Sequence, residues 1–379
     1  MHIKRARHAV GIVFLLLGTL IGVWATRIPD FKLMLDVDES GFGLVLLAMA
    51  LGAVLGFPIA GYLTDRFGAA AISKVFAVGI LIGFAILPFG TSVAVILPLM
   101  LVVGFCIGTL DVAMNGWGAE VEKELGRPVM SSYHGLYSLG AGFGAGAGAL
   151  ALWYDLDLLP HFAGWSLLMA IPLVFALRTP WASEKTGPGG KRPPFVAIPK
   201  GGLFFVGIMA LIAALGEGAI TDWAALYQIQ ELGFDSSEAA VGFAVFSVAM
   251  VIMRFCGDQV IARFGAVPVA RASGIAAALG CALLVWGESI WMIWAGCAVM
   301  GLGNAVIFPL AMSRAAADPT MSKGAALASV ATLGYGAFLF GPPILGFIGD
   351  AFSLRVSFAL VAILALLIAG LAGALKVRS

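Results

Sequence analysis

The chain has 379 residues, of which 61% are hydrophobic and 11% are charged, and its formal net charge is +1 at pH 7. Soluble domains are about 45–50% apolar and about 25% charged, so this composition excludes a soluble globular protein. The near-neutral charge gives no indication of nucleic-acid binding. We therefore expect a polytopic membrane protein, with most of its mass in the lipid bilayer.

Apolar segments long enough to span a bilayer, about 20 residues each, recur along the whole chain. The first follows a basic N-terminus and resembles a signal peptide, but it is long enough to span and further spans follow, so we expect an uncleaved helix. The polar breaks predict twelve helices, at approximately 8–28, 41–64, 73–91, 93–117, 131–153, 160–178, 201–228, 238–258, 268–287, 290–313, 324–348 and 353–375. The four cysteines lie in apolar runs, which indicates packing residues.

One segment between the sixth and seventh spans, RTPWASEKTGPGGKRPPFVAIPK, is rich in proline, glycine and charge and is typical of a linker. We predict an N-terminal six-helix half over residues 1–178, a cytoplasmic linker over 179–200 and a C-terminal six-helix half over 201–379. Most basic residues fall at one set of helix ends, which indicates that both termini are cytoplasmic.

The two halves repeat each other with a shift of 197 residues. LDVDES at 35–40 matches LGFDSS at 232–237, and RFG at 66–68 matches RFG at 263–265. Gly104 maps to Gly301 by the same shift. A duplicated half predicts pseudo-symmetry, with a binding site near the middle of the membrane between the halves.

The loop GYLTDRFG at 61–68 resembles the signature loop of the major facilitator superfamily, Gly-x-Leu-x-Asp-Arg-x-Gly followed by basic residues. Ala69 and Ala70 stand where that family has its basic pair. The resemblance implies an all-α membrane protein with the twelve-helix major facilitator fold. It also implies that the first, fourth, seventh and tenth helices line a central cavity.

Three longer segments resemble the MosC/YbjJ-like group of that superfamily: WATRIPDFK, DVAMNGWGAEVEKELGRPVMSSYHGLYSLGAGFGA and EGAITDWAALY. This resemblance implies a small polar solute, such as the amino-cyclitol rhizopine.

Several charged and amide residues lie deep in the spans of the expected cavity helices. A charge in the bilayer core costs at least about 2.5–3.5 kcal/mol, so such residues should face a wet cavity or a partner. We expect Asp111, Glu217 and His134 to carry protons, since buried carboxylates and histidine exchange protons near neutral pH. The alternative is a structural hydrogen bond or ion pair with a neighbouring helix.

Aromatic residues on the same helices have rings that can stack on a sugar or cyclitol. The alternative is packing, or a belt at the membrane interface. The predicted solute-binding residues are Trp24, Asp111, Asn115, Glu217, Trp223, Tyr227, Asn304 and Tyr335.

Charged residues near the helix ends are candidate gates. We expect Arg27 and Asp222 to form an ion pair that closes the outer side, the alternative being two independent interfacial charges. The signature loop implies an inner gate at Gly61, Asp65, Arg66 and Gly68, in which Asp65 can accept hydrogen bonds from the N-terminus of a helix in the other half. Glu120 and Arg314 can pair similarly, the alternative being solvated charge.

The sequence contains no Walker pattern, no metal-site spacing and no nucleophile–base motif, so we expect neither ATP drive, cofactor nor enzyme activity. Because buried carboxylates are present and ATP machinery is not, we expect proton-coupled symport by alternating access in the bacterial inner membrane. Asp111 and Glu217, with no lysine or arginine expected near the membrane middle, disfavour anionic solutes and favour a neutral polyol, sugar, cyclitol or amine.

Two alternatives remain open. One is a proton-coupled exporter of amphiphilic cations, although the fifth helix lacks the proline of a Gly-Pro pattern that the family's antiporters usually carry. The other is a membrane receptor that binds solute without moving it. The expected partners are the solute, protons and lipid, with no nucleic acid, and the expected oligomeric state is a monomer. Gly140, Gly144 and Gly148 predict a small-residue ridge on the fifth helix.

Overall fold

A computed structural model describes residues 2–37, 39–185 and 198–376, so most of the predicted linker, 186–197, lies outside the described residues. In this part of the chain, 12 helices are long and apolar enough to span a membrane. They match the twelve predicted spans in order, and the all-α prediction is confirmed. The first helix is longer than predicted, because α1 (His2–Leu35) continues through the polar residues at both ends of its apolar run.

The chain divides into two compact units, which are described separately. Unit 1 contains residues 1–126, 133–197 and 321–328, and unit 2 contains 127–132, 198–320 and 329–379. The main division therefore falls between Ala197 and Ile198. In addition, the start of α5 belongs to unit 2 and the start of α13 belongs to unit 1, so each of these helices begins in one unit and continues in the other.

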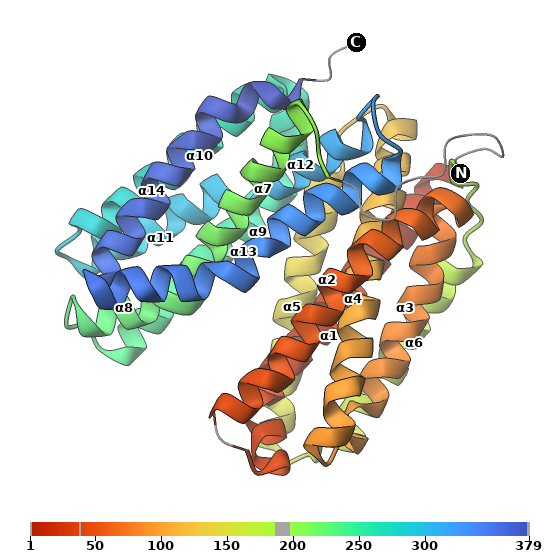
Figure 1. The fold of residues 1–379 in the computed structure, drawn as a ribbon, viewed down its shortest axis with the longest axis horizontal. Coiled ribbons are helices and arrows are strands. Elements are labelled where there is room, and N and C mark those ends of the chain that lie inside the picture. Colours follow the sequence, from red (N-terminus) through yellow and green to blue (C-terminus); the bar gives the residue numbers. More distant parts are fainter. Residues whose placement is uncertain (1, 38, 186–197, 377–379) are drawn as a thin grey trace. The chain divides into compact units, whose positions relative to one another are not determined.

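The helices of unit 1 after α1 are α2 (Glu39–Phe67), α3 (Ala69–Ile86), α4 (Val93–Leu125), α5 (Met130–Trp153) and α6 (Leu158–Arg178). Those of unit 2 are α7 (Gly202–Gly218), α8 (Ala224–Gln230), α9 (Ser236–Phe264), α10 (Ala266–Trp286), α11 (Ile290–Asn304), α12 (Ile307–Ala316), α13 (Lys323–Ala351) and α14 (Leu354–Leu371). In unit 2, α10 lies beside α11 and α14, and in unit 1, α3 lies beside α4 and α6 (Figure 1).

Two of the spans in unit 2 are interrupted. A π-helical turn at Ala219–Trp223 separates α7 from α8, and residues 305–306 separate α11 from α12. The sequence predicts uninterrupted helices at both places. Interrupted helices leave backbone groups without partners in the helix, and such groups can serve a site inside the membrane. These two interruptions are therefore places to look for a site in unit 2.

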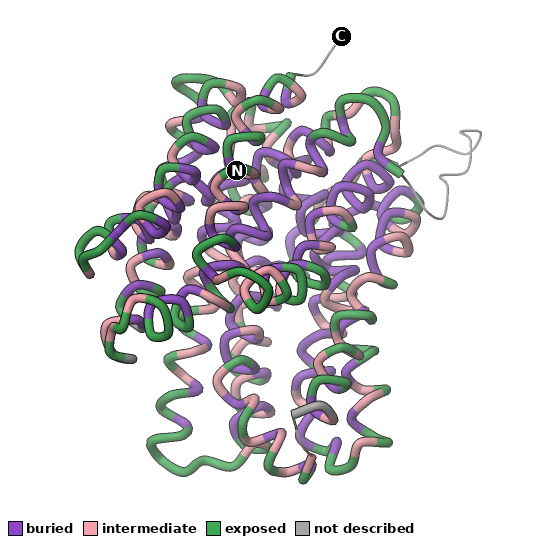
Figure 2. The backbone as a smooth tube through the Cα atoms, turned by 60° about the vertical axis from the view of Figure 1, so that its left-hand side comes forward, coloured by how far each residue is buried: buried purple, intermediate pink, exposed green. Residues whose placement is uncertain are grey.

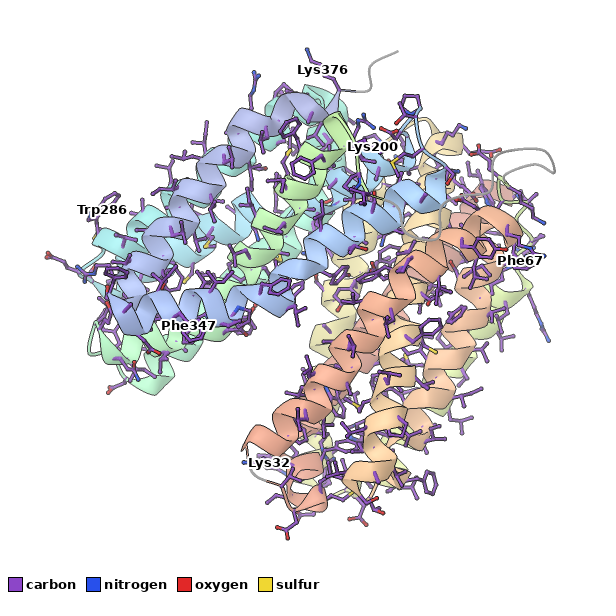
Figure 3. The ribbon with its side chains drawn as sticks, viewed as in Figure 1. Lys32, Phe67, Lys200, Trp286, Phe347 and Lys376 are labelled. Atoms are coloured by element: carbon purple, nitrogen blue, oxygen red, sulfur yellow. The ribbon has the colours of Figure 1, made fainter. Side chains whose placement is uncertain are left out.

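Large apolar side chains cover the outer faces of the helices. Leu167 and Ile171 of α6 are 73% and 69% exposed, and exposed residues run along most helices beside buried ones (Figure 2). Trp286 and Phe347 lie near one end of unit 2 with their side chains outward, whereas Lys200 and Lys376 lie near its other end (Figure 3). Apolar exposure on this scale suits lipid contact and not water.

The backbone carries the predicted internal repeat. Gly68 and Gly265 precede α3 and α10 with φ angles of 95° and 83°, and Asp36 and Gly233 also share a positive φ. A Cβ on Gly104 would overlap the carbonyl oxygen of Met49, and one on Gly301 would overlap that of Phe246. Each pair is related by the shift of 197 residues, so the repeat includes turn conformation and helix contacts.

The predicted small-residue ridge of α5 packs directly on the backbone of α1. A Cβ on Gly144 would overlap the carbonyl oxygen of Thr19, and one on Gly140 would overlap that of Leu15. Gly142 and Gly146, on another face of α5, have nothing within 4 Å. The ridge therefore brings α1 and α5 closer than any larger residue permits.

We expect Gly144→Ala to lower the melting temperature of the detergent-purified protein by about 5 °C, since overpacking costs about 1–3 kcal/mol. Gly142→Ala and Gly146→Ala are matched controls on the same helix and should melt no lower than the parent, because alanine favours helix. Equal melting of the Gly144→Ala and Gly142→Ala proteins would contradict the close packing.

Candidate functional site

Three buried polar residues form a hydrogen-bonded set inside unit 1. Asn115 of α4 donates from Nδ2 to the Asp111 carbonyl oxygen at 2.9 Å, and its Oδ1 lies 3.1 Å from Nε2 of His134 on α5. The Asp111 carboxylate is also near, with Oδ1 3.5 Å from Asn115 Nδ2. The three residues are at most 7% exposed. The structure thus brings two predicted proton carriers together through one amide, which forms the Asp111–Asn115–His134 cluster.

Aromatic residues enclose one side of this cluster. The ring of Phe14 on α1 meets the His134 ring edge-on at 5.3 Å and stacks on Tyr133 at 5.4 Å. These contacts leave His134 little room to turn, because rings in a close-packed interior are held by their neighbours. Its orientation toward Asn115 is therefore fixed by packing on α1.

Glu217, at the end of α7, has a partner that the sequence analysis missed. Arg254 of α9 places Nη2 3.4 Å from Glu217 Oε2, with the Arg254 side chain 8% exposed and that of Glu217 35% exposed. The expectation that no arginine lies near the membrane middle was therefore wrong. A carboxylate and a guanidinium compensate each other's charge in the membrane, so Glu217 is not a lone acid and charge alone does not exclude anionic solutes.

Asn304 lies at the end of α11, beside the interruption of that span. Its side chain is 5% exposed, and its Nδ2 donates to the carbonyl oxygen of Ala213 on α7 at 2.6 Å. Asn304 therefore ties the broken α11–α12 span to the helix that carries Glu217. The amide nitrogen of Asn304 is thus engaged in a hydrogen bond to the backbone of α7 in this structure.

The predicted aromatic solute ligands separate into two groups. Tyr227 is fully buried and donates its hydroxyl to the Leu284 carbonyl oxygen at 2.8 Å, and Trp24 is 3% exposed and packs on Phe31. Both side chains pack against their neighbours in this structure, and their assignment as solute ligands stays a prediction. Trp223 and Tyr335 are only partly buried and remain candidates.

At its expected outer end, unit 1 holds Arg27 within its own hydrogen bonds. Arg27 donates from Nε to Asp30 at 2.7 Å and from Nη2 to the Leu156 carbonyl oxygen at 2.9 Å, and its Nη1 lies 3.3 Å from His161 Nδ1. Arg27 and Asp30 also line a cavity of about 470 Å³. The ion pair expected between Arg27 and Asp222 joins the two units and stays a prediction.

The GYLTDRFG segment, expected to be a loop, is helical as far as Phe67. Its Asp65, near the C-terminal end of α2, holds the start of α13, whose first residues belong to unit 1. Its Oδ1 accepts from the Gly324 backbone N–H at 2.9 Å, and its Oδ2 accepts from the Ser322 hydroxyl. A Cβ on Gly61 would lie 2.9 Å from the Gly324 carbonyl oxygen, so this glycine permits the close approach. A carboxylate suits a helix N-terminus because the first N–H groups have no partner within the helix.

The other two signature residues have local partners. Arg66 is exposed and donates to the Tyr62 hydroxyl at 2.7 Å. Gly68 begins α3 with a positive φ, and a Cβ there would lie 2.7 Å from Ser183 Cβ. Ser183 follows α6 and its hydroxyl accepts from the Ala70 N–H at 3.0 Å, so the start of α3 is tied to the segment after α6.

Glu120 and Arg314 each have a partner within their own unit. Glu120 accepts from the Trp181 indole at 2.7 Å and lies 3.4 Å from Lys323. Arg314 pairs with Asp318 at 2.9 Å in unit 2. The pair expected between Glu120 and Arg314 joins the two units and stays a prediction.

Glu184 completes the charge network beside Glu120. It pairs with Lys123 at 2.6 Å and with Lys323 at 2.7 Å, and the hydrogen bonds from these two ammonium groups lower the pKa of the Glu184 carboxyl to about 2. Because this pKa lies below its ordinary value of 4.5, the pairing stabilises the fold above pH 4.5 and is lost as the pH falls toward 2.

We expect Glu184→Gln to lower the melting temperature by at most about 2 °C at pH 7, because the pair is largely exposed to solvent. The difference between variant and parent should disappear as the pH is lowered from about 4.5 to about 2. Melting curves of both proteins across this range check the expectation. A difference that persists unchanged at pH 2 would show that the charge of Glu184 is not responsible.

Asp258 is a further charged residue that the sequence analysis missed. It lies one turn after Arg254 in α9, and both are at most 8% exposed. Two opposite charges four residues apart in an apolar span are unusual, and this pattern could have identified Arg254 and Asp258 from the sequence. The internal repeat does not predict Asp258, because the shift of 197 residues pairs Asp258 with Gly61. It likewise pairs Asp65 with Ala262, so neither acid has an acid at the related position.

A sequence model of the Major Facilitator Superfamily matches residues 9–319 and 206–379. The chain is 40% identical over 367 residues to the uncharacterized transporter y4wD of Sinorhizobium fredii, covering 96% of each chain. It is 29% identical over 348 residues to the membrane protein MosC of Rhizobium meliloti, covering 91% of this chain and 84% of MosC.

Solved structures agree in fold. The human organic anion transporter MFSD10 (TETRAN) aligns with a TM-score of 0.78 and 17% identity, covering 98% of this chain and 100% of its own. The transporter FucP, in its outward conformation, aligns with a TM-score of 0.76 and 15% identity, covering 98% of both chains. The family match and the named relatives indicate a transporter and not an enzyme. This chain belongs to the Major Facilitator Superfamily and is an integral membrane transporter.

Proposed function

We propose that this transporter moves a small polar solute together with protons by alternating access. The observation that carries the proposal is the Asp111–Asn115–His134 cluster, in which a carboxylate and an imidazole are joined by one amide inside a membrane-spanning bundle. Such groups are expensive to bury without a function. Glu217, beside the π-helical turn of unit 2, is the second candidate proton carrier.

The favoured solutes are a neutral polyol, sugar, cyclitol or amine-bearing analogue. Partly exposed aromatic rings at Trp223 and Tyr335 suit stacking on a sugar ring. FucP, similar in fold, is a fucose:proton symporter, and the structural neighbour XylE is a proton:xylose symporter. Because Arg254 supplies a positive charge beside Glu217, acidic sugars should be tested together with the neutral ones.

A proton-coupled exporter of amphiphilic cations is the second candidate. The buried carboxylate of Asp111 and the partly exposed one of Glu217 favour it, since they can balance a cationic solute. The pairing of Glu217 with Arg254 argues against it, because the guanidinium already supplies a positive charge at that carboxylate.

We also propose a bacterial inner-membrane location with both termini in the cytoplasm. In unit 2, Lys200 and Lys376 lie near the same end (Figure 3), and lysine is enriched on the cytoplasmic side of such proteins. The relatives named above come from bacteria.

A thermal-shift screen of the detergent-purified protein tests the solute class. Neutral sugars, cyclitols, amino sugars and acidic sugars are compared with lipophilic cations at several concentrations. A ligand stabilises the native state by mass action, so a true solute raises the melting temperature with dose. At one hundred times its Kd, the free energy of unfolding rises by about 2.7 kcal/mol. We expect polar solutes to do this. Stabilisation by lipophilic cations alone would make the exporter the better proposal.

A further inference from the structure

One turn of α9 carries two buried charges in a membrane-spanning segment. Arg254 and Asp258 are 6% and 8% exposed, and the span that contains them extends from Val241 to Phe264. Their spacing of four residues places them on the same face of the helix. Each charge reaches a different neighbour, so this Arg254–Asp258 turn joins two parts of unit 2.

Asp258 holds the start of α5. Its Oδ1 accepts from the Ser131 backbone N–H at 2.9 Å, and its Oδ2 accepts from the Ser132 N–H at 3.0 Å and from the Ser132 hydroxyl. These N–H groups belong to the first turn of α5 and have no partner within the helix. The carboxylate also suits the positive end of the helix dipole. This accounts for the inclusion of residues 127–132 in unit 2.

Arg254 makes contacts in two directions. Its backbone carbonyl oxygen accepts the Ser131 hydroxyl at 2.7 Å, whereas its side chain reaches Glu217 Oε2 and the Ala305 carbonyl oxygen, each at 3.4 Å. Ala305 lies in the interruption between α11 and α12. The same residue therefore touches the start of α5, the candidate proton carrier of unit 2 and the broken span.

The turn is packed too closely to accommodate movement of one contact alone. A Cβ on Gly257 would lie 2.5 Å from the Ser131 hydroxyl oxygen and 2.6 Å from Val306 Cγ1. Such contacts transmit displacement, because close-packed groups cannot move independently. Gly257 therefore holds Ser131 and Val306 against the same turn of α9.

We propose that the Arg254–Asp258 turn is a coupling element that makes the hold on the start of α5 depend on Glu217. Asp258 and Arg254 are positioning residues in this scheme, which rests on the proposed role of Glu217 in transport. When a proton or solute takes over the Glu217 carboxylate, the ion pair between Arg254 and Glu217 is lost, the turn shifts and Asp258 releases Ser131 and Ser132.

Hydrogen–deuterium exchange of the full-length protein in lipid nanodiscs tests this coupling without a known solute. The backbone amides of Ser131 and Ser132 report directly on the hold by Asp258. Asp258→Asn should speed their exchange by about tenfold or more, the factor for about 1.4 kcal/mol lost from hydrogen bonds to a charged group. Glu217→Gln, which removes the charge of Glu217 from its ion pair with Arg254, should speed the same amides although Glu217 does not contact them.

The double variant decides between coupling and independent effects. If Glu217 acts through the turn, Glu217→Gln combined with Asp258→Asn exchanges no faster than Asp258→Asn alone. Effects that multiply, or a Glu217→Gln variant with parental exchange at Ser131 and Ser132, would overturn the proposal. Ser131→Ala replaces Asp258→Asn in the cycle, read at Ser132, if the latter fails to fold.

Two matched substitutions at exposed sites control for the chemistry of the changes. Asp350→Asn and Glu288→Gln alter the same residue types outside these contacts and should leave Ser131 and Ser132 unchanged. Amides of α10 report global unfolding and should stay at their parental rates in every variant. The exchange needs neither solute nor pH gradient, so failure of the solute screen and failure of this coupling give separate results.

Discussion

Asp111→Asn is expected to abolish proton-driven accumulation of solute while leaving counterflow intact. A gradient of one pH unit is worth about 1.36 kcal/mol per proton, which supports an accumulation of about tenfold for one coupled proton. Asparagine has the same size as aspartate but cannot release a proton. The substitution leaves the neighbouring Asn115 and His134 unchanged. The accumulation ratio should therefore fall from about ten to about one.

The measurement uses proteoliposomes with an imposed pH gradient and the solute that gives the largest stabilisation in the screen. Counterflow without a gradient shows whether the variant still binds and moves solute. Asp350→Asn, an exposed aspartate on α13, is the matched control and should accumulate solute normally. Proton-driven accumulation at the parental level in Asp111→Asn would remove Asp111 from the coupling.

Asp65→Asn is expected to release the start of α13. The variant loses the charge in two hydrogen bonds, those from Gly324 and Ser322. Hydrogen bonds to charged groups contribute about 1.5–3 kcal/mol, which corresponds to a shift of about 10- to 100-fold in the fraction of protein with this contact open. Ala328 is 4% exposed and lies against Gly61, so a cysteine there should become more reactive.

Maleimide labelling of Ala328→Cys in detergent, with the four natural cysteines replaced, measures this opening. Asp155→Asn is the control, because Asp155 is exposed with a φ of 49° that asparagine also tolerates. Labelling rates that rise equally in both variants, or in neither, would contradict the expectation that Asp65 holds the start of α13.

The start of α13 at Asp65 and the start of α5 at Asp258 have the same construction. In each, an acid near the C-terminal end of one helix accepts backbone N–H groups from the first residues of a helix that continues into the other unit. Of the two acids, the signature loop identifies only Asp65. Opening of one contact can be measured separately from the other, through Ala328 and through the Ser131 amide.

The twelve spans and the internal repeat follow from the sequence by itself. The length of an apolar run sets whether a helix can cross a bilayer, and this property is local in the chain. The shift of 197 residues likewise predicts that Gly68 and Gly265 share one conformation and that Gly104 and Gly301 make equivalent contacts. The high cost of burying charge also identifies Asp111 and Glu217 as candidate site residues.

The partners of these residues were decided only by the tertiary structure. Glu217 pairs with Arg254, Asn115 joins Asp111 to His134, and Tyr227 turns its hydroxyl to Leu284. The rotation and depth of each helix determine which side chains meet, and these follow from the packing of many residues at once. A single polar residue in an apolar span therefore shows that a partner must exist, whereas its identity depends on how the helices pack.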